Sequence, residues 1–140
     1  MVEVTSYVDV NVFVYWLGNH PLYGEPAYNW IKKMENADRG RYLTSTLTIY
    51  QTLVIMAGLS HTTLKNPPLL TEVITSLTSL PGLIIHPLTP KHALHAKQLT
   101  HQYPLDYEDS LHLATALKAE TKDIISNDQD FDHTPLNRTF

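Results

Sequence analysis

Short apolar runs alternate along the chain with longer stretches in which apolar residues recur every three or four positions. The short runs predict β-strands at residues 7–10, 41–44, 83–86 and 123–126. The longer stretches predict helices at residues 11–17, 26–35, 46–58, 69–80, 90–103 and 107–120. Strands separated by helices favour an α/β fold, with a central mostly parallel sheet flanked by helices on both faces.

The helix predicted at residues 46–58 is apolar along most of its length. Leu47, Tyr50, Val54 and Ala57 form a stripe at helical spacing, which their apolar neighbours widen. We therefore expect this helix to be largely buried. Gln51 lies on the same face as Leu47 and Val54, so we expect its polar group to be aimed at a site rather than at water.

Length and composition indicate one folded domain. The chain has 140 residues, 43% hydrophobic and 17% charged, which suffices for a single core over residues 1–140. It has no cysteine, so a metal site would use oxygen or imidazole ligands. No apolar run is long enough to cross a membrane, and Glu3 and Asp9 argue against a signal peptide. We therefore expect a cytoplasmic protein with no membrane partner.

The net charge limits how the protein could bind nucleic acid. A formal charge of -4 argues against a broad basic face, because such binding depends on neutralising many phosphates. Lys32, Lys33, Arg39 and Arg41 form a local basic cluster. This cluster either flanks a phosphate or is a solvated helix end, which is the commoner case.

Four aspartates are expected at the edge of the sheet where parallel strands end. Asp9 ends the first strand, Asp109 lies in the first turn of the last helix, and Asp128 and Asp130 follow the last strand. Carboxylates brought together repel one another, and a hard cation such as Mg²⁺ or Mn²⁺ would neutralise them. Two such ions can activate a water and stabilise the oxygens of a phosphodiester. Taken singly, each aspartate also fits a helix cap or a turn.

Three segments together resemble the PIN-domain ribonucleases, and most closely the small VapC-type toxins of toxin–antitoxin pairs. The segments are Tyr-Val-Asp-Val-Asn-Val-Phe at residues 7–13, the helix from Leu105 through Ala114 to Leu117, and Ser-Asn-Asp-Gln-Asp-Phe at residues 126–131. Their order and spacing carry the resemblance, which covers essentially the whole chain and implies a PIN-like fold.

The resemblance also implies a site, a cofactor and partners. It implies that the catalytic and metal-binding residues are Asp9, Asp109 and Asp128, that Asn11 supports them by hydrogen bonding, and that Ser126 and Asp130 are secondary contributors. The implied cofactor is Mg²⁺ or Mn²⁺ and the implied substrate is RNA. A cognate antitoxin and a second copy of the chain, forming a homodimer, are the implied protein partners.

One position departs from the family pattern. The family places a glutamate six residues after a small hydroxyl residue, and counting from Ser45 this position holds Gln51. An amide oxygen can still bind a cation, so Gln51 remains a cofactor-binding candidate, with weaker metal binding as the expected consequence. The alternative function is a catalytically weak or inactive PIN-fold module that binds RNA or a protein partner.

Two further features bear on function. His112 follows Asp109 by one helical turn and could approach the site, although a partly buried helix histidine is the commoner case. A phosphotransfer enzyme or receiver would need two acidic residues, separated by one, at the first strand, where this chain has Asp9 and Asn11. No glycine-rich phosphate loop follows a strand, which further disfavours nucleotide binding.

Overall fold

The computed structural model describes residues 6–140; residues 1–5 of the expected domain, Glu3 among them, lie outside the described residues. The strands are β1 (Ser6–Val8), β2 (Tyr42–Ser45), β3 (Leu83–His86), β4 (Asp123–Ile125) and β5 (Asn137–Thr139). The α-helices are α1 (Val10–Leu17), α2 (Gly24–Glu35), α3 (Thr46–Leu59), α4 (Pro67–Thr78), α5 (Pro90–Gln102) and α6 (Tyr107–Lys118). A 3₁₀ helix, η1 (Gln129–His133), lies between β4 and β5. Among the described residues, no helix is both long and apolar enough to span a membrane.

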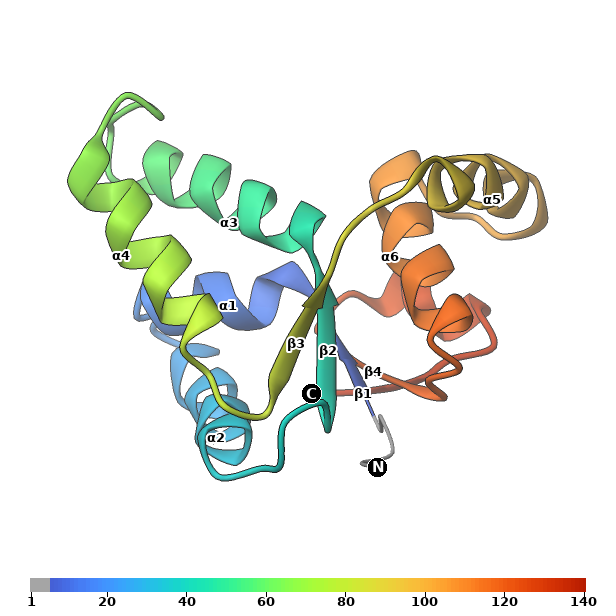
Figure 1. Ribbon diagram of the computed structural model, residues 1–140, viewed down its shortest axis with the longest axis horizontal. Coiled ribbons are helices and arrows are strands. Elements are labelled where there is room, and N and C mark those ends of the chain that lie inside the picture. The colour runs from blue at the N-terminus through green and yellow to red at the C-terminus, as the bar shows by residue number, and fades with distance from the viewer. Residues whose placement is uncertain (1–5) are drawn as a thin grey trace.

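The strands form one parallel sheet in the order β3-β2-β1-β4-β5 (Figure 1). Strand β1 lies in the middle, with Tyr7 beside Leu43 of β2 on one side and Ile124 of β4 on the other. Parallel strands require crossover connections, which the helices supply here. The arrangement confirms the predicted α/β class with helices on both faces of the sheet.

Successive side chains of the central strands point into two separate core layers. Val8 and Ile125 face the layer formed with α1 to α4, which lie together on one side of the sheet (Figure 1). Tyr7 and Ile124 face the layer formed with α5 and α6 on the other side. Strands buried on both faces are apolar at nearly every position, which is why these short runs were recognisable in the sequence.

Three helices begin earlier than predicted, and one of them is α4, which starts at Pro67 rather than at residue 69. Val10 is the first residue of α1 rather than the last of a strand, because the Asp9 carboxylate accepts a hydrogen bond from the Val10 N–H (2.8 Å) and caps the helix. Helix α2 begins at Gly24 rather than at Pro26. Pro26 fits within its first turn because the N–H groups there have no partner inside the helix.

The expectation that the helix at residues 46–58 is largely buried is wrong for half of its surface. Tyr50 and Val54 of the predicted stripe are 59% and 43% exposed. The opposite side of α3 is the buried one, and it carries Thr48 and Thr52. The Thr52 hydroxyl donates to the Thr48 carbonyl (2.6 Å), and the Thr48 hydroxyl binds that of Thr44 (2.7 Å), so both can be buried without loss of hydrogen bonds.

Candidate active site

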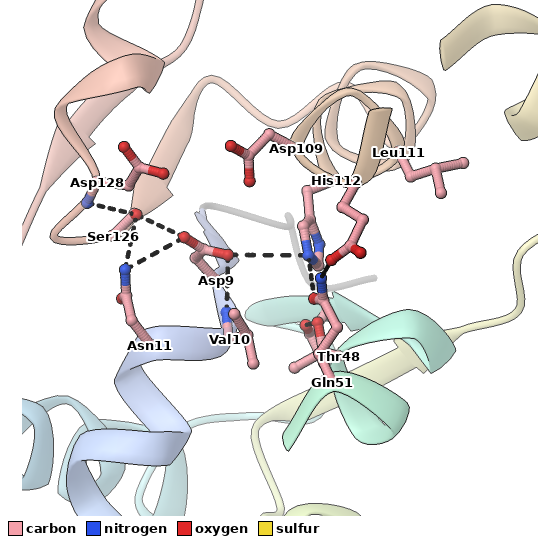
Figure 2. Close-up of polar contacts among 12 residues, drawn as sticks. Asp9, Val10, Asn11, Thr48, Gln51, Asp109, Leu111, His112, Ser126 and Asp128 are labelled. Atoms are coloured by element: carbon pink, nitrogen blue, oxygen red, sulfur yellow. Dashed lines mark hydrogen bonds and ion pairs between the residues drawn. The ribbon is translucent and has the colours of Figure 1, made fainter. Parts of the chain in front are cut away.

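The predicted site residues come from three neighbouring parts of the fold. Asp9 follows β1, Asn11 lies in the first turn of α1, and Asp109 lies in the first turn of α6. Ser126 follows β4, which pairs with β1 so that Val8 lies beside Ile125. The carboxyl ends of β1 and β4 therefore meet, as the sequence predicted, and the side chains of Asp9, Asp109 and Asp128 approach a common space (Figure 2).

Asp9 is a buried carboxylate, 3% exposed, and both of its oxygens accept hydrogen bonds. Oδ1 accepts from the Val10 N–H at 2.8 Å. Oδ2 accepts from the Ser126 hydroxyl at 2.6 Å and from the Asn11 amide at 3.4 Å (Figure 2). Such donors stabilise a buried negative charge and fix its orientation. Asp9 thus caps α1 and also lies beside the acidic group, so a capping role does not compete with the predicted role in the site.

Ser126 and Asn11 tie the two strand ends together. The Ser126 hydroxyl oxygen accepts hydrogen bonds from the Asp128 N–H (3.0 Å) and from the Asn11 amide (3.3 Å). The side-chain oxygen Oδ1 of Asn11 accepts from the Asn127 N–H (3.3 Å). Because these bonds join α1 to the segment after β4, the position of Asp128 is coupled to that of Asp9. The supporting positions expected for Asn11 and Ser126 fit this geometry.

Asp109, Asp128 and Asp130 form the tightest acidic group among the described residues. Each offers one carboxylate oxygen such that all three lie within 4.8 Å of one another. Burial raises the pKa of Asp109 to about 8, with further increases from the charges of Asp106, Asp9, Asp128 and Asp130. Asp9 lies outside the group of three, although its charge acts on Asp109. Carboxylate oxygens at this spacing suit a hard divalent cation such as Mg²⁺ or Mn²⁺.

Gln51 reaches the site through His112 and not through the aspartates. The Gln51 Oε1 lies 2.7 Å from His112 Nε2, which in turn lies 3.8 Å from Asp9 Oδ1 (Figure 2). The Gln51 amide nitrogen donates to Glu108. On its other side, His112 Nδ1 is 2.6 Å from the Tyr7 hydroxyl. Gln51 is therefore turned towards the site, as the stripe analysis expected, although Tyr50 and Val54 of the same stripe are exposed.

The sequence left two alternatives for His112, a residue that approaches the site or a buried helix histidine, and the structure shows features of both. His112 is fully buried in α6 and it also borders Asp9. Burial lowers the pKa of its imidazole, against the opposing effect of the Asp9 charge, so the neutral form predominates at neutral pH. Tyr7 and Glu108 were not anticipated as neighbours of the site. Tyr7 looked like an ordinary core residue, and only the position of Glu108 next to Asp109 could have pointed to it.

The basic cluster does not border the acidic group. Lys33 and Arg41 line a shallow hollow with Asp38 and Tyr42, at the start of β2. The acidic group lies at the opposite, carboxyl ends of the strands. Lys33 rests over the Trp30 ring, with its Nζ 4.2 Å from the ring centroid. The interpretation of this cluster as a solvated helix end fits its location better than a phosphate contact at the site.

The site as a whole is rich in carboxylates that could hold a cation. It offers several carboxylates, among them that of Asp109, whose pKa is raised to about 8 by burial and by neighbouring charges, and a set of fixed donors that hold Asp9. No cysteine is available as a nucleophile. The chemistry that fits such a set is the activation of water by a metal ion for attack on a phosphodiester.

Comparisons with known proteins identify a family and a shared fold. A family model described as "PIN domain" matches residues 6–136. Comparison of the sequence with curated proteins gives no match.

Several solved structures share the fold. VapC20 of Mycobacterium tuberculosis, described as a Sarcin-Ricin loop cleaving toxin, superposes with a TM-score of 0.73 at 11% identity, covering 95% of this chain and 99% of its own. A toxin–antitoxin complex from Klebsiella pneumoniae gives 0.68 at 16% identity, with coverage of 95% and 99%. VapBC2 from Rickettsia felis, bound to a DNA fragment from its promoter, gives 0.67 at 16% identity, with coverage of 97% and 98%. At these identities the similarity establishes the fold.

Proposed function

Because the chain belongs to the PIN domain family, we propose that it is a metal-dependent endoribonuclease and the toxin of a toxin–antitoxin pair. The observation that carries the proposal is the acidic group at the strand ends, where three carboxylate oxygens lie within 4.8 Å of one another. Such a group is costly in a protein that binds no cation, because its charges repel one another. The similarity to toxin–antitoxin structures supports the biological role.

The cation would be Mg²⁺ or Mn²⁺, held by Asp9, Asp109 and Asp128, with Asp130 as a secondary contributor. When bound, the ion supplies a water of lowered pKa and neutralises charge on the phosphate. The chain's own part is to hold the carboxylates in place. Ser126 and Asn11 orient Asp9 through hydrogen bonds of 2.6 and 3.4 Å, and Ser126 also fixes the backbone of Asp128. We assign Asp9 and Asp109 as ligands of the same cation because the family pattern has metal-binding aspartates at these two positions.

We propose three partners for the protein, which would act in the cytoplasm. They are an RNA substrate, a cognate antitoxin and a second copy of the chain. Four large apolar side chains of α3 are exposed, namely Tyr50, Val54, Ile55 and Leu59. Exposed apolar groups on one helix are typical of surfaces that another protein covers.

A second candidate function is an RNA- or partner-binding module without cleavage. The observation that favours it is the state of Gln51, whose amide is engaged by His112 and Glu108. In this case the fold and the acidic group would remain, but the cation would bind too weakly or in the wrong place for cleavage.

Incubation of purified protein with end-labelled RNA separates the two functions. The nuclease requires that Mn²⁺ supports cleavage, that excess EDTA abolishes it, and that Asp109→Asn abolishes it as well. Glu72→Gln is the matched control, because Glu72 is an exposed carboxylate on α4, away from the site. Retention of RNA on a filter without cleavage, in Mn²⁺, would favour the binding module. Equal cleavage by Asp109→Asn would reject the proposed site.

A further inference from the structure

Four side chains form an unbroken line from the core to the surface beside Asp9. The Tyr7 hydroxyl lies 2.6 Å from His112 Nδ1, and His112 Nε2 lies 2.7 Å from Gln51 Oε1. The Gln51 amide nitrogen then reaches the carboxylate of Glu108 on α6. The line joins β1, α6 and α3, and it passes within 3.8 Å of Asp9 at His112 (Figure 2).

The chemistry of Glu108 fixes the direction of the hydrogen bonds. An ionised carboxylate only accepts hydrogen bonds, so the NH₂ group of Gln51 must face Glu108. The amide oxygen of Gln51 therefore faces His112, and this oxygen also only accepts. It follows that His112 Nε2 carries a proton and donates it to Gln51.

Tyr7 cannot determine this arrangement alone. A tyrosine hydroxyl can both donate and accept a hydrogen bond, so it can pair with His112 Nδ1 whether that nitrogen is protonated or unprotonated. Because Nε2 already holds the proton of the neutral ring, Nδ1 accepts from the Tyr7 hydroxyl. Gln51 is the acceptor at hydrogen-bonding distance that selects this tautomer, since Asp9 Oδ1 is farther away, at 3.8 Å.

We propose that Gln51 is a positioning residue, which binds the Nε2–H of His112 and thereby orients the imidazole beside Asp9, rather than a ligand of the cation. The proposal deepens the proposed function, because the residue so positioned is Asp9. With its only N–H proton directed to Gln51, the imidazole leaves Asp9 Oδ1 free of that bond. Among residues 6–140, the Val10 N–H is then the one close donor to Oδ1, at 2.8 Å.

Glu108 fixes the orientation of the Gln51 amide. It holds the NH₂ group of Gln51 and so prevents the amide from turning over. If the amide turned, its NH₂ group would face the protonated Nε2 of His112, and two donors would meet in a partly buried place. A glutamate at position 51 would accept from His112 equally well, but it would place two carboxylates against each other at Glu108. The glutamine at position 51 is therefore matched to the glutamate at position 108.

The hydrogen-bond arrangement can be tested by NMR without metal or RNA. In protein labelled with ¹⁵N, a long-range ¹H–¹⁵N spectrum at neutral pH should show His112 as a single tautomer, protonated at Nε2 and unprotonated at Nδ1. Gln51→Met preserves the length of the side chain and removes the acceptor, so both the Nε2 and the Nε2–H resonances should move. A ring protonated at Nδ1 in the natural protein, or unchanged His112 resonances in Gln51→Met, would overturn the proposal.

A charge exchange between positions 51 and 108 tests the matching. Gln51→Glu alone should lower the Tm of the metal-free protein by about 3 °C, because two carboxylates then face each other. Adding Glu108→Gln should restore the Tm, since the amide introduced on α6 can donate to the carboxylate introduced on α3. Glu72→Gln in place of Glu108→Gln is the control and should not restore the Tm. Equal restoration by both would contradict the pairing, and this test applies even if Gln51→Met fails to fold.

Saturation with Mg²⁺ separates a positioning role from a ligand role. If Gln51 remains bound to His112, the His112 resonances keep the pattern of the single Nε2–H tautomer when the ion is added. A change to the pattern of Gln51→Met would mean that the Gln51 oxygen has moved to the ion, and would overturn the proposal. The metal-free measurements do not depend on cation binding or cleavage, so a failure of the proposed nuclease would leave them valid.

Discussion

Replacement of Asp109 by asparagine should stabilise the metal-free protein at alkaline pH. The carboxylate of Asp109 makes no hydrogen bond with any described residue, so the amide removes the charge without breaking such a bond. In the folded protein, burial and neighbouring carboxylates raise the pKa of Asp109 from 3.8 to about 8. The folded state therefore binds a proton more tightly than the unfolded state, and stability is lost as pH rises from about 4 to about 8.

The size of the effect follows from the environment of Asp109. A pKa difference between 3.8 and about 8 corresponds to about 6 kcal/mol for a fully shielded group. Two charges about 5 Å apart repel by about 1 kcal/mol in water, and by about 3 kcal/mol at an effective dielectric constant of about 20. Because Asp109 is partly exposed, solvent screening reduces the total to about 2 kcal/mol.

Urea unfolding in EDTA provides the measurement. At pH 8.5 the unfolding free energy of Asp109→Asn should exceed that of the natural protein by about 2 kcal/mol, and the difference should shrink towards pH 4. Mn²⁺ at about 100 times its Kd should then stabilise the natural protein by about 2.7 kcal/mol and the variant by much less. Equal unfolding free energies of the two proteins at pH 8.5 would refute the argument that Asp109 is held against charge repulsion.

Three more substitutions test particular contacts. Ser126→Ala should lower Mn²⁺ affinity by about 10- to 100-fold in a calorimetric titration, because Asp9 loses its donor at 2.6 Å; an unchanged Kd would deny that Ser126 orients Asp9. Tyr7→Phe should reduce the unfolding free energy by about 1–2 kcal/mol in urea, since it leaves buried His112 Nδ1 without a donor, and no loss would mean that water replaces the hydroxyl. Gly82→Ala should cost about 1–3 kcal/mol, because a Cβ atom would lie 2.6 Å from the Met34 carbonyl oxygen; a variant as stable as the natural protein would show that this turn yields freely.

The parts of the fold that the sequence revealed are those with strong local signals. Strand β3 has the predicted bounds, and α5 begins at the predicted residue, Pro90, which Thr89 caps. Strand β5 was missed because Asn137, Arg138 and Thr139 form a polar edge strand, in which the pairing partner rather than the side-chain pattern determines the conformation. For α3, nearly every position is apolar, so spacing alone could not identify the buried side.

The site could be predicted only in part, for a similar reason. Strand ends and helix starts placed Asp9, Asp109, Asp128 and Ser126 near one another, because parallel topology brings such positions to one edge. The contacts of Gln51 with His112 and Glu108 depend on how α3 and α6 are spaced and turned relative to each other. Positions 51 and 108 are far apart in sequence and carry no motif that links them. Such pairs become visible only when both helices are in place.

The position of β1 in the sheet determines when the site can form during synthesis. Strand β1 is the first to be made, yet it pairs with β4, so that the Asp9 N–H donates to the Ile125 carbonyl (3.0 Å). The hydroxyl that holds Asp9 comes from Ser126, even later in the chain. Contacts between such distant segments form late, because the intervening chain must first be available and ordered. A nascent chain that has been made only as far as β3 therefore has Asp9 but lacks Asp109, Asp128 and Asp130, so the acidic site cannot assemble until the segment after β4 has been made.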